Sequence, residues 1–164
     1  MAFVYIYSIV CIWIVLVWVK RNIVLCFYFS GTSLFTATGR VSISGTHDIS
    51  FPSVLLNEGG DYDASSGVFT CRIPGQYWFA ATITKAVFHG LDTLYCYVMI
   101  NQNYKLKMYT DPTSDPTPAY SMSASAGFHL KLGDRVQVGN CNYYIYIIND
   151  LDTFFSGMLI KPDV

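Results

Sequence analysis

Histidine and cysteine are the side chains of this chain best suited to acid–base or nucleophilic chemistry. The three histidines, His47, His89 and His129, lie in different segments, and none has a carboxylate at a catalytic spacing. The chain has no HExxH, GxSxG or phosphate-binding glycine-loop motif, and Cys141 with any of the histidines would be a weak catalytic pair. The sequence therefore predicts that the protein is not an enzyme.

Paired aspartates are the candidate metal ligands, because calcium takes six to eight oxygen ligands and carboxylates supply them. The pairs are Asp61 with Asp63, Asp111 with Asp115, and Asp150 with Asp152. Aspartate is also common in turns, where its side chain hydrogen-bonds nearby main-chain amides, and turn formation is the usual explanation for all three pairs. If calcium binds, Asp150 and Asp152 are the favoured site, and the sequence indicates no other cofactor.

Tyrosines near the C-terminus are the candidate ligand-binding residues. Tyr143, Tyr144 and Tyr146 lie in a short apolar segment that has more aromatic surface than the core of a small domain requires. If alternate side chains face outward, they could stack on sugar rings or apolar ligands. The interpretation that the sequence favours is that they fill the core or a seam between subunits.

Short strands separated by turn clusters must position these residues. The segments 57–61 and 63–67 are rich in Asn, Asp, Ser and Gly, and Pro74-Gly75 is a further turn signal. Three prolines mark 110–118 as an exposed loop. The spacing of the strands predicts an all-β sandwich. The predicted strands are 34–43, 49–56, 68–70, 76–84, 94–101, 104–109, 121–132, 135–138, 143–148 and 154–160.

Composition narrows the class of protein. With 164 residues and 52% hydrophobic residues, the chain has the length and composition of one folded domain with a sizeable core. Only 13% of the residues are charged, against about 25% in an average soluble domain. So little charge indicates that part of the surface is buried against other subunits. With a net charge of −1, the chain lacks the excess of positive charge that is typical of nucleic-acid-binding proteins.

The first 32 residues form a hydrophobic leader, and the domain is expected at 33–164. Residues 2–19 are an apolar run of borderline length for a membrane anchor, and Lys20-Arg21 follow it. In a second interpretation a secretory signal peptide starts at Lys20 and has residues 23–29 as its apolar region, with an upstream extension before it. The protein is expected to be secreted, and a membrane-anchored form is the alternative.

Three cysteines lie in the expected domain, Cys71, Cys96 and Cys141. Their number is odd, so at most one disulfide forms within the domain. Cys96 is expected to pair with Cys71 or Cys141, or to stay reduced in the core. The spacings match no zinc motif.

Large apolar residues, one Asn and one Gly recur at fixed intervals in the central part of the chain, at Phe51, Asn57, Tyr62, Phe69, Gly75, Tyr77 and Phe79. This spacing resembles the signature of the C1q domain family. Ala81 stands where the family has an aromatic residue, so we expect a bulky neighbour to compensate, either Trp78 or a residue of another strand. Phe128, Leu130, Gly133, Asp134 and Val136 resemble a second family segment, and Phe155 and Gly157 lie in a stretch similar to its closing strand.

The resemblance implies the two-sheet antiparallel jelly roll shared with tumour necrosis factor, assembled as a tight homotrimer. It also implies a secreted recognition protein that binds microbial surface components, glycans or other extracellular ligands. A cytokine-like or synaptic-organiser-like receptor ligand is the second hypothesis, and a structural extracellular assembly protein is the third. The membrane is a partner only if the leader is an uncleaved anchor.

Overall fold

Strands make up all the regular secondary structure of the computed structural model, which describes residues 4–9, 12–19, 22–29, 31–39, 42–43, 48–86, 94–110, 119–141, 145–146 and 152–163. The chain divides into two units, Met1–Thr32 and Ser33–Val164.

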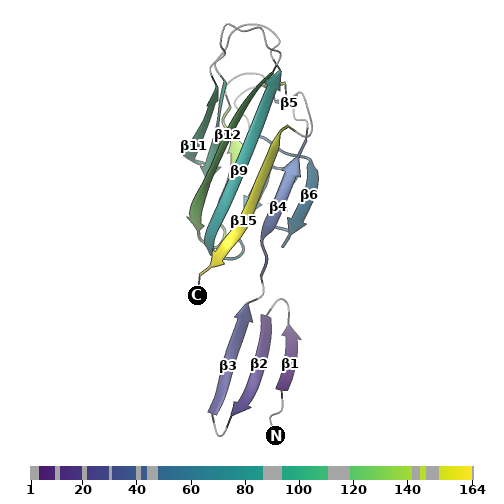
Figure 1. The fold of residues 1–164 in the computed structure, drawn as a ribbon, viewed down its shortest axis with the longest axis vertical. Coiled ribbons are helices and arrows are strands. Elements are labelled where there is room, and N and C mark those ends of the chain that lie inside the picture. Colours follow the sequence, from purple (N-terminus) through teal and green to yellow (C-terminus); the bar gives the residue numbers. More distant parts are fainter. Residues whose placement is uncertain are drawn as a thin grey trace. The chain divides into compact units, whose positions relative to one another are not determined.

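The N-terminal unit is a three-stranded antiparallel sheet in which consecutive strands pair (Figure 1). Its strands are β1 (Val4–Ile9), β2 (Ile12–Val19) and β3 (Asn22–Phe29). They are rich in β-branched and aromatic residues, which favour strands. Among the described residues we find no helix with the length and apolar character to cross a membrane. The leader, as a signal peptide or as an anchor, stays a prediction.

The first large sheet of the second unit has five antiparallel strands in the order β12–β9–β15–β4–β6 and faces the viewer in Figure 1. In that order the strands span Ala119–Leu130, Gly75–Ala86, Phe154–Pro162, Leu34–Thr38 and Ser53–Glu58. β9 pairs with β12 along its whole length, from Gly75 opposite Leu130 to Ala86 opposite Ala119.

The second large sheet also has five strands, in the order β11–β10–β13–β8–β7. In that order the strands span Asn103–Thr110, Leu94–Ile100, Arg135–Gly139, Val68–Thr70 and Tyr62–Asp63. A small additional pair joins β14 (Ile145–Tyr146) to β5 (Ser42–Ile43). Strands far apart in the sequence lie side by side, since β15 lies between β9 and β4 and β13 lies between β10 and β8. The prediction of an all-β, two-sheet antiparallel jelly-roll sandwich is confirmed.

Strand boundaries differ from the prediction at the start of β6. We expected a strand from residue 49, but β6 begins at Ser53. Proline has no main-chain N–H, so Pro52 cannot continue a ladder, and the Ile49 amide instead donates to the Val138 carbonyl of the second sheet at 2.8 Å. Most of the predicted loop 110–118 and of the predicted strand 143–148 lies outside the described residues.

Aromatic rings from both sheets fill the space between them. The Phe35 ring lies at the centre, with ring centroids 4.7 Å from Tyr62, 4.9 Å from Phe155 and 5.4 Å from Phe69. Phe35 and Phe155 are fully buried side chains of the first sheet, and Phe69 is one of the second. The core is therefore a continuous aromatic cluster that joins the two layers.

A buried disulfide and a buried thiol lie at the edge of this core. Cys96 of β10 is bonded to Cys141, which follows β13, and Cys71 is free and buried. The structure thus selects one of the three alternatives left by the sequence. Burial raises the pKa of the Cys71 thiol, so it stays protonated and unreactive at neutral pH.

A substitution at Gly157 tests how closely the core is packed. A Cβ at this position would lie 2.5 Å from ring carbons of Phe35 and Phe79. We expect Gly157→Ala to lower the free energy of unfolding by about 1–3 kcal/mol, because close-packed rings cannot move aside. Gly127→Ala is the control, since its nearest heavy atom would be 3.7 Å away. Urea denaturation measures both, and equal values for the two variants would contradict the packing.

Peptide mapping tests the disulfide. Trypsin digestion without reductant should link the peptides 86–105 and 136–164 and leave the peptide 41–72 with a free Cys71. The bond closes a loop with a sequence separation of 45 residues, so reduction should lower the free energy of unfolding by about 4 kcal/mol. A mapped bond that contains Cys71 would contradict the structure.

Candidate functional site

The C-terminal residues that the sequence proposed for binding fall largely outside the described residues. Tyr143, Tyr144 and Asp150 lie outside them, and for Tyr146 the structure describes only its main chain, paired with Ser42 in β14. Asp152 is exposed, and its carbonyl accepts a hydrogen bond from Thr84 Oγ1 at 2.8 Å. The described part of the chain has no group of three or more metal-ligating residues. The tyrosine ligand site and the calcium site stay predictions.

The signature residues, in contrast, lie together in the core. Phe51, Tyr62, Phe69, Tyr77, Phe79 and Phe155 are all buried. Asn57 ties the ends of its turn together, because its side chain donates to the Tyr62 carbonyl at 2.8 Å and accepts from the Tyr62 amide at 3.2 Å. A Cβ at Gly75 would overlap the Lys161 carbonyl of the neighbouring strand. These residues position strands and leave ligand binding to the outer surfaces.

Trp78 does not compensate for the small side chain of Ala81. Residues three apart on a strand face opposite sides of the sheet, so Trp78 is exposed whereas Ala81 is buried. Phe155 of β15 lies directly opposite Ala81. Its ring occupies the core beside the position where the family signature has an aromatic residue.

The outer face of the first sheet carries rows of small hydroxyl residues, which we call the hydroxyl face. Its side chains bond across the strands, Thr82 to Ser123 at 2.9 Å, Thr84 to Ser121 at 2.8 Å, and Ser156 to Thr36 at 3.0 Å. Burying a polar group is costly only when it lacks a partner. These paired hydroxyls can therefore be covered by another surface at little cost in free energy.

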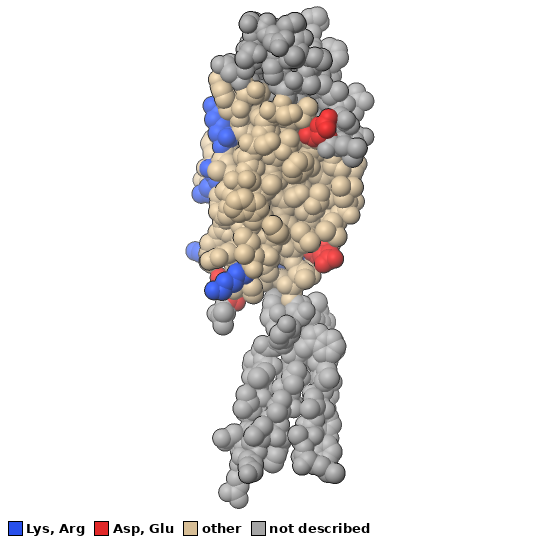
Figure 2. Space-filling view, viewed as in Figure 1, with Lys and Arg blue, Asp and Glu red and all other residues tan. Residues whose placement is uncertain are grey.

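Apolar side chains flank the hydroxyl face, and its centre carries no charge. Trp78, Met158 and Ile160 are exposed at one end, and Val54 and Leu55 are exposed on β6. Figure 2 shows Lys and Arg along the left edge of this face, whereas its centre has no charged residue. An uncharged, partly apolar sheet face of this kind is typical of a surface that is buried in an assembly.

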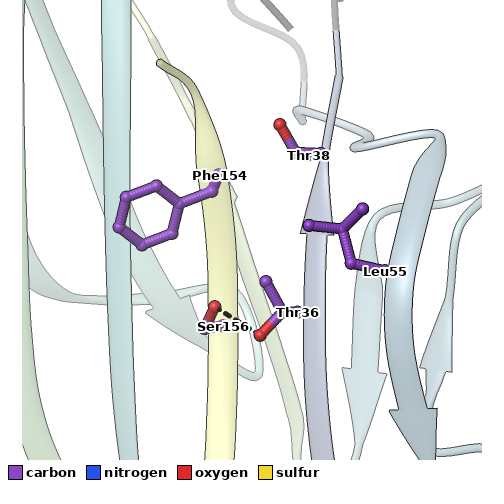
Figure 3. Close-up of a pocket in the computed structure, with 5 residues that line it drawn as sticks. All are labelled: Thr36, Thr38, Leu55, Phe154 and Ser156. Carbon is purple, nitrogen blue, oxygen red and sulfur yellow. Dashed lines mark hydrogen bonds between the residues drawn. The ribbon is translucent and has the colours of Figure 1, made fainter. Parts of the chain in front are cut away.

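A shallow hollow of about 300 Å³ lies on the hydroxyl face (Figure 3). Thr36 and Thr38 of β4, Leu55 of β6, and Phe154 and Ser156 of β15 line it. It holds no ionisable group among these five residues, so it suits an apolar side chain better than a charged ligand.

The outer face of the second sheet carries a different chemistry, which sequence reasoning missed. Tyr95 and Tyr97 of β10 and Tyr104 and Tyr109 of β11 gather there around Lys107, and these five residues form what we call the tyrosine surface. Asn101 and Gln102 form the connecting turn with φ values of 50° and 65°, as a two-residue hairpin turn requires. Tyr95 and Tyr97 lie two residues apart in the sequence, as do Lys107 and Tyr109. Residues at this spacing share one side of a strand, and this is the sequence signal from which the surface could have been predicted.

A β-bulge completes the tyrosine surface. Val98 lies opposite Leu106, but the next residue, Met99, lies opposite Tyr104, so β11 has one extra residue at Lys105. The extra residue brings Tyr104 to the outer side of the sheet. There its ring stacks on Tyr97 with centroids 4.5 Å apart, and its hydroxyl accepts a hydrogen bond from Asn140 Nδ2 at 2.7 Å.

Cation–π contacts hold the charge of this surface in place. The Lys107 ammonium lies 4.7 Å from the centroid of Tyr95 and 5.0 Å from that of Tyr109, within the range of an attractive interaction. Tyr95 and Tyr109 are themselves cross-strand partners. The amine is thus presented between two rings.

Comparison with known proteins relates this architecture to one family. A family model described as "C1q domain" matches residues 34–160. Human "Complement C1q tumor necrosis factor-related protein 2" is 35% identical over 119 residues, which cover 70% of this chain and 39% of that protein. The chain therefore spans less than half the length of this relative.

Solved structures share the fold at low sequence identity. The "Globular Domain of Zebrafish Complement 1qA protein" has a TM-score of 0.62 at 17% identity, covering 80% of this chain and 99% of that chain. The "Structure of Eiger TNF from S. frugiperda" has a TM-score of 0.66 at 13% identity, covering 82% and 96%. At these identities the likeness shows the fold alone.

The buried hydroxyl of Tyr62 should make the stability of the fold depend on pH in the alkaline range. It donates to the Phe51 carbonyl at 3.3 Å and accepts from the Phe51 amide at 3.2 Å, and burial raises the pKa of Tyr62 from 10.0 to about 12. A raised folded pKa stabilises the fold below pH 10.0, and this contribution is lost between pH 10.0 and about 12.

Tyr62→Phe should therefore lower the free energy of unfolding at pH 8 by about 1 kcal/mol. The free energy of unfolding of the variant should also fall less steeply with pH in the alkaline range than that of the wild type. The difference in slope should correspond to about one proton. Denaturant titrations across this range measure the slope. Parallel curves for the two proteins would contradict the role of this hydroxyl.

Proposed function

The chain belongs to the C1q domain family, and we propose on this basis that it is a secreted, homotrimeric recognition protein that binds extracellular ligands. Microbial surface components and glycans are the ligands that we favour. The observation that carries the proposal is the combination of an uncharged hydroxyl face on one sheet with a tyrosine surface on the other. The first suits assembly, and the second suits binding.

The hydroxyl face supports assembly through the first sheet. Three pairs of its hydroxyl groups are bonded within the subunit, and Trp78 and Met158 provide apolar area that water would otherwise cover. The hollow beside Leu55 accepts an apolar side chain of a neighbouring copy. A trimer is the assembly that the family fold favours.

The Cys96–Cys141 disulfide supports an extracellular location, because disulfides form and persist in oxidising compartments. Three identical sites on one rigid assembly would also raise the avidity for a repetitive surface far above the affinity of one site.

Calcium at Asp150 and Asp152 remains part of the proposal, and a chelator-dependent melting temperature would support it.

A cytokine-like receptor ligand is the second candidate function. The similarity to a tumor necrosis factor-related protein favours it. Crosslinking of the protein to a cell-surface receptor, without binding to microbial or glycan surfaces, would select this function over the first.

Charge on the hydroxyl face should prevent assembly. We expect the purified chain to form particles of three times its 18.4 kDa mass in light scattering. Ser156→Arg should shift the protein to monomers, because it places an unpaired charge in the buried seam. Leu132→Arg is the control, since it adds the same charge at an exposed turn on the surface and should leave the trimer intact.

Circular dichroism checks that both variants keep their strands. A wild-type monomer at micromolar concentration would count against the proposal, and so would a Ser156→Arg protein that remains trimeric.

A further inference from the structure

We propose that the tyrosine surface binds an acidic sugar, that is, a sugar ring that carries a carboxylate or a sulfate. The inference rests on the proposed recognition function and assigns the ligand class and its place on the domain. Three properties of the surface support it: its accessible rings, its held cation, and its lack of exposed aliphatic side chains.

Two of the four rings are exposed, and the other two are half-buried. Tyr104 is 59% exposed and Tyr109 is 50% exposed, so each offers a large part of its ring to a ligand. The Tyr97 ring stacks on the Tyr104 ring, and the Tyr95 ring packs edge-on against Tyr97 with ring centroids 5.7 Å apart. Tyrosine combines an apolar ring with a polar hydroxyl, which matches a sugar ring with its apolar face and polar rim.

The charge of the surface selects an anion. Lys107 is held between Tyr95 and Tyr109, and the neighbouring Lys105 is also exposed. Within the described part of the chain, the ion pairs join Arg72 to Asp61 and His129 to Asp163, and neither lysine has a carboxylate partner. A carboxylate or sulfate next to the rings would meet a positive charge that no described acidic group neutralises.

The remaining side chains disfavour other partners. The exposed aliphatic residues of the described domain are Val54, Leu55, Leu132, Met158 and Ile160, and none belongs to β10 or β11. A lipid surface would need such residues to insert into its apolar region. Two lysines on a chain of net charge −1 are also too few for strong nucleic-acid binding.

The surface stays open in the proposed assembly. The hydroxyl face and the tyrosine surface lie on the outer sides of different sheets, and the aromatic core separates them. Burial of the first sheet in a trimer would therefore leave one tyrosine surface accessible on each subunit.

Isothermal titration calorimetry of the full chain with short sugars tests the inference. The probes are a heparin hexasaccharide with sulfates and uronates, a hyaluronan hexasaccharide with uronates alone, and neutral chitohexaose. We expect at least one acidic sugar to bind at least about tenfold more tightly than chitohexaose, and added salt to weaken that binding. The two acidic probes distinguish sulfate from carboxylate recognition.

Variants locate the binding. Tyr109→Ala should weaken binding of the acidic sugar about three- to tenfold through loss of a stacking ring. Lys107→Met keeps most of the apolar stem and should weaken it about two- to fivefold through loss of the charge. Lys161→Met removes one positive charge from β15 of the other sheet and should leave the affinity unchanged.

The inference is overturned if neither acidic sugar binds, if chitohexaose binds equally well, or if Tyr109→Ala and Lys107→Met leave the affinity unchanged. Tighter binding of a hexauridylate or of a hexaglutamate peptide would also overturn it, in favour of a nucleic acid or an acidic protein segment. A hexasaccharide occupies one site, so its affinity does not depend on assembly. Light scattering of the same samples therefore separates failure of this inference from failure of the proposed trimer.

Discussion

The packing of Phe35 among rings from both sheets is the contact on which the rest of the domain depends. Side chains alternate between the two sides of a strand, so a ring fixed in the core also fixes the register of its strand. With Phe35, Phe79 and Phe155 inside, the hydroxyl residues of neighbouring strands come to lie side by side on the outside. A slip of one residue would bury these hydroxyls and expose the rings. The chemistry of the outer surface is thus a consequence of the core.

The fold could be predicted from the sequence because its signals are local. Turn residues and alternating aromatics mark the strands, and the signature places Phe51, Tyr62 and Phe79 in the core. Phe35 lies outside the signature and gains its central role only when β4 pairs with β15. The tyrosine surface escaped sequence reasoning for a similar reason, since a bulge in β11 decides the side on which Tyr104 lies. The cysteine pairing likewise depends on β10 lying beside β13.

The two sheets divide the surface by chemistry. On the first sheet, Thr82 is bonded to Ser123 and Thr84 to Ser121, and no charge lies at the centre, so this part of the face has little to offer a polar ligand. On the second sheet, a lysine is held between rings and the aromatic groups remain open to solvent. A single domain can thereby keep contacts with copies of itself apart from contacts with other molecules.

The disulfide has a consequence for the surface above it. Cys96 points into the core between Tyr95 and Tyr97, which point outward, and its bond to Cys141 anchors β10 to the end of β13. The main chain beneath the rings is therefore covalently restrained before any ligand arrives. A partner that stacks on these tyrosines would lose little free energy to ordering of the backbone, because folding and oxidation have already removed that entropy.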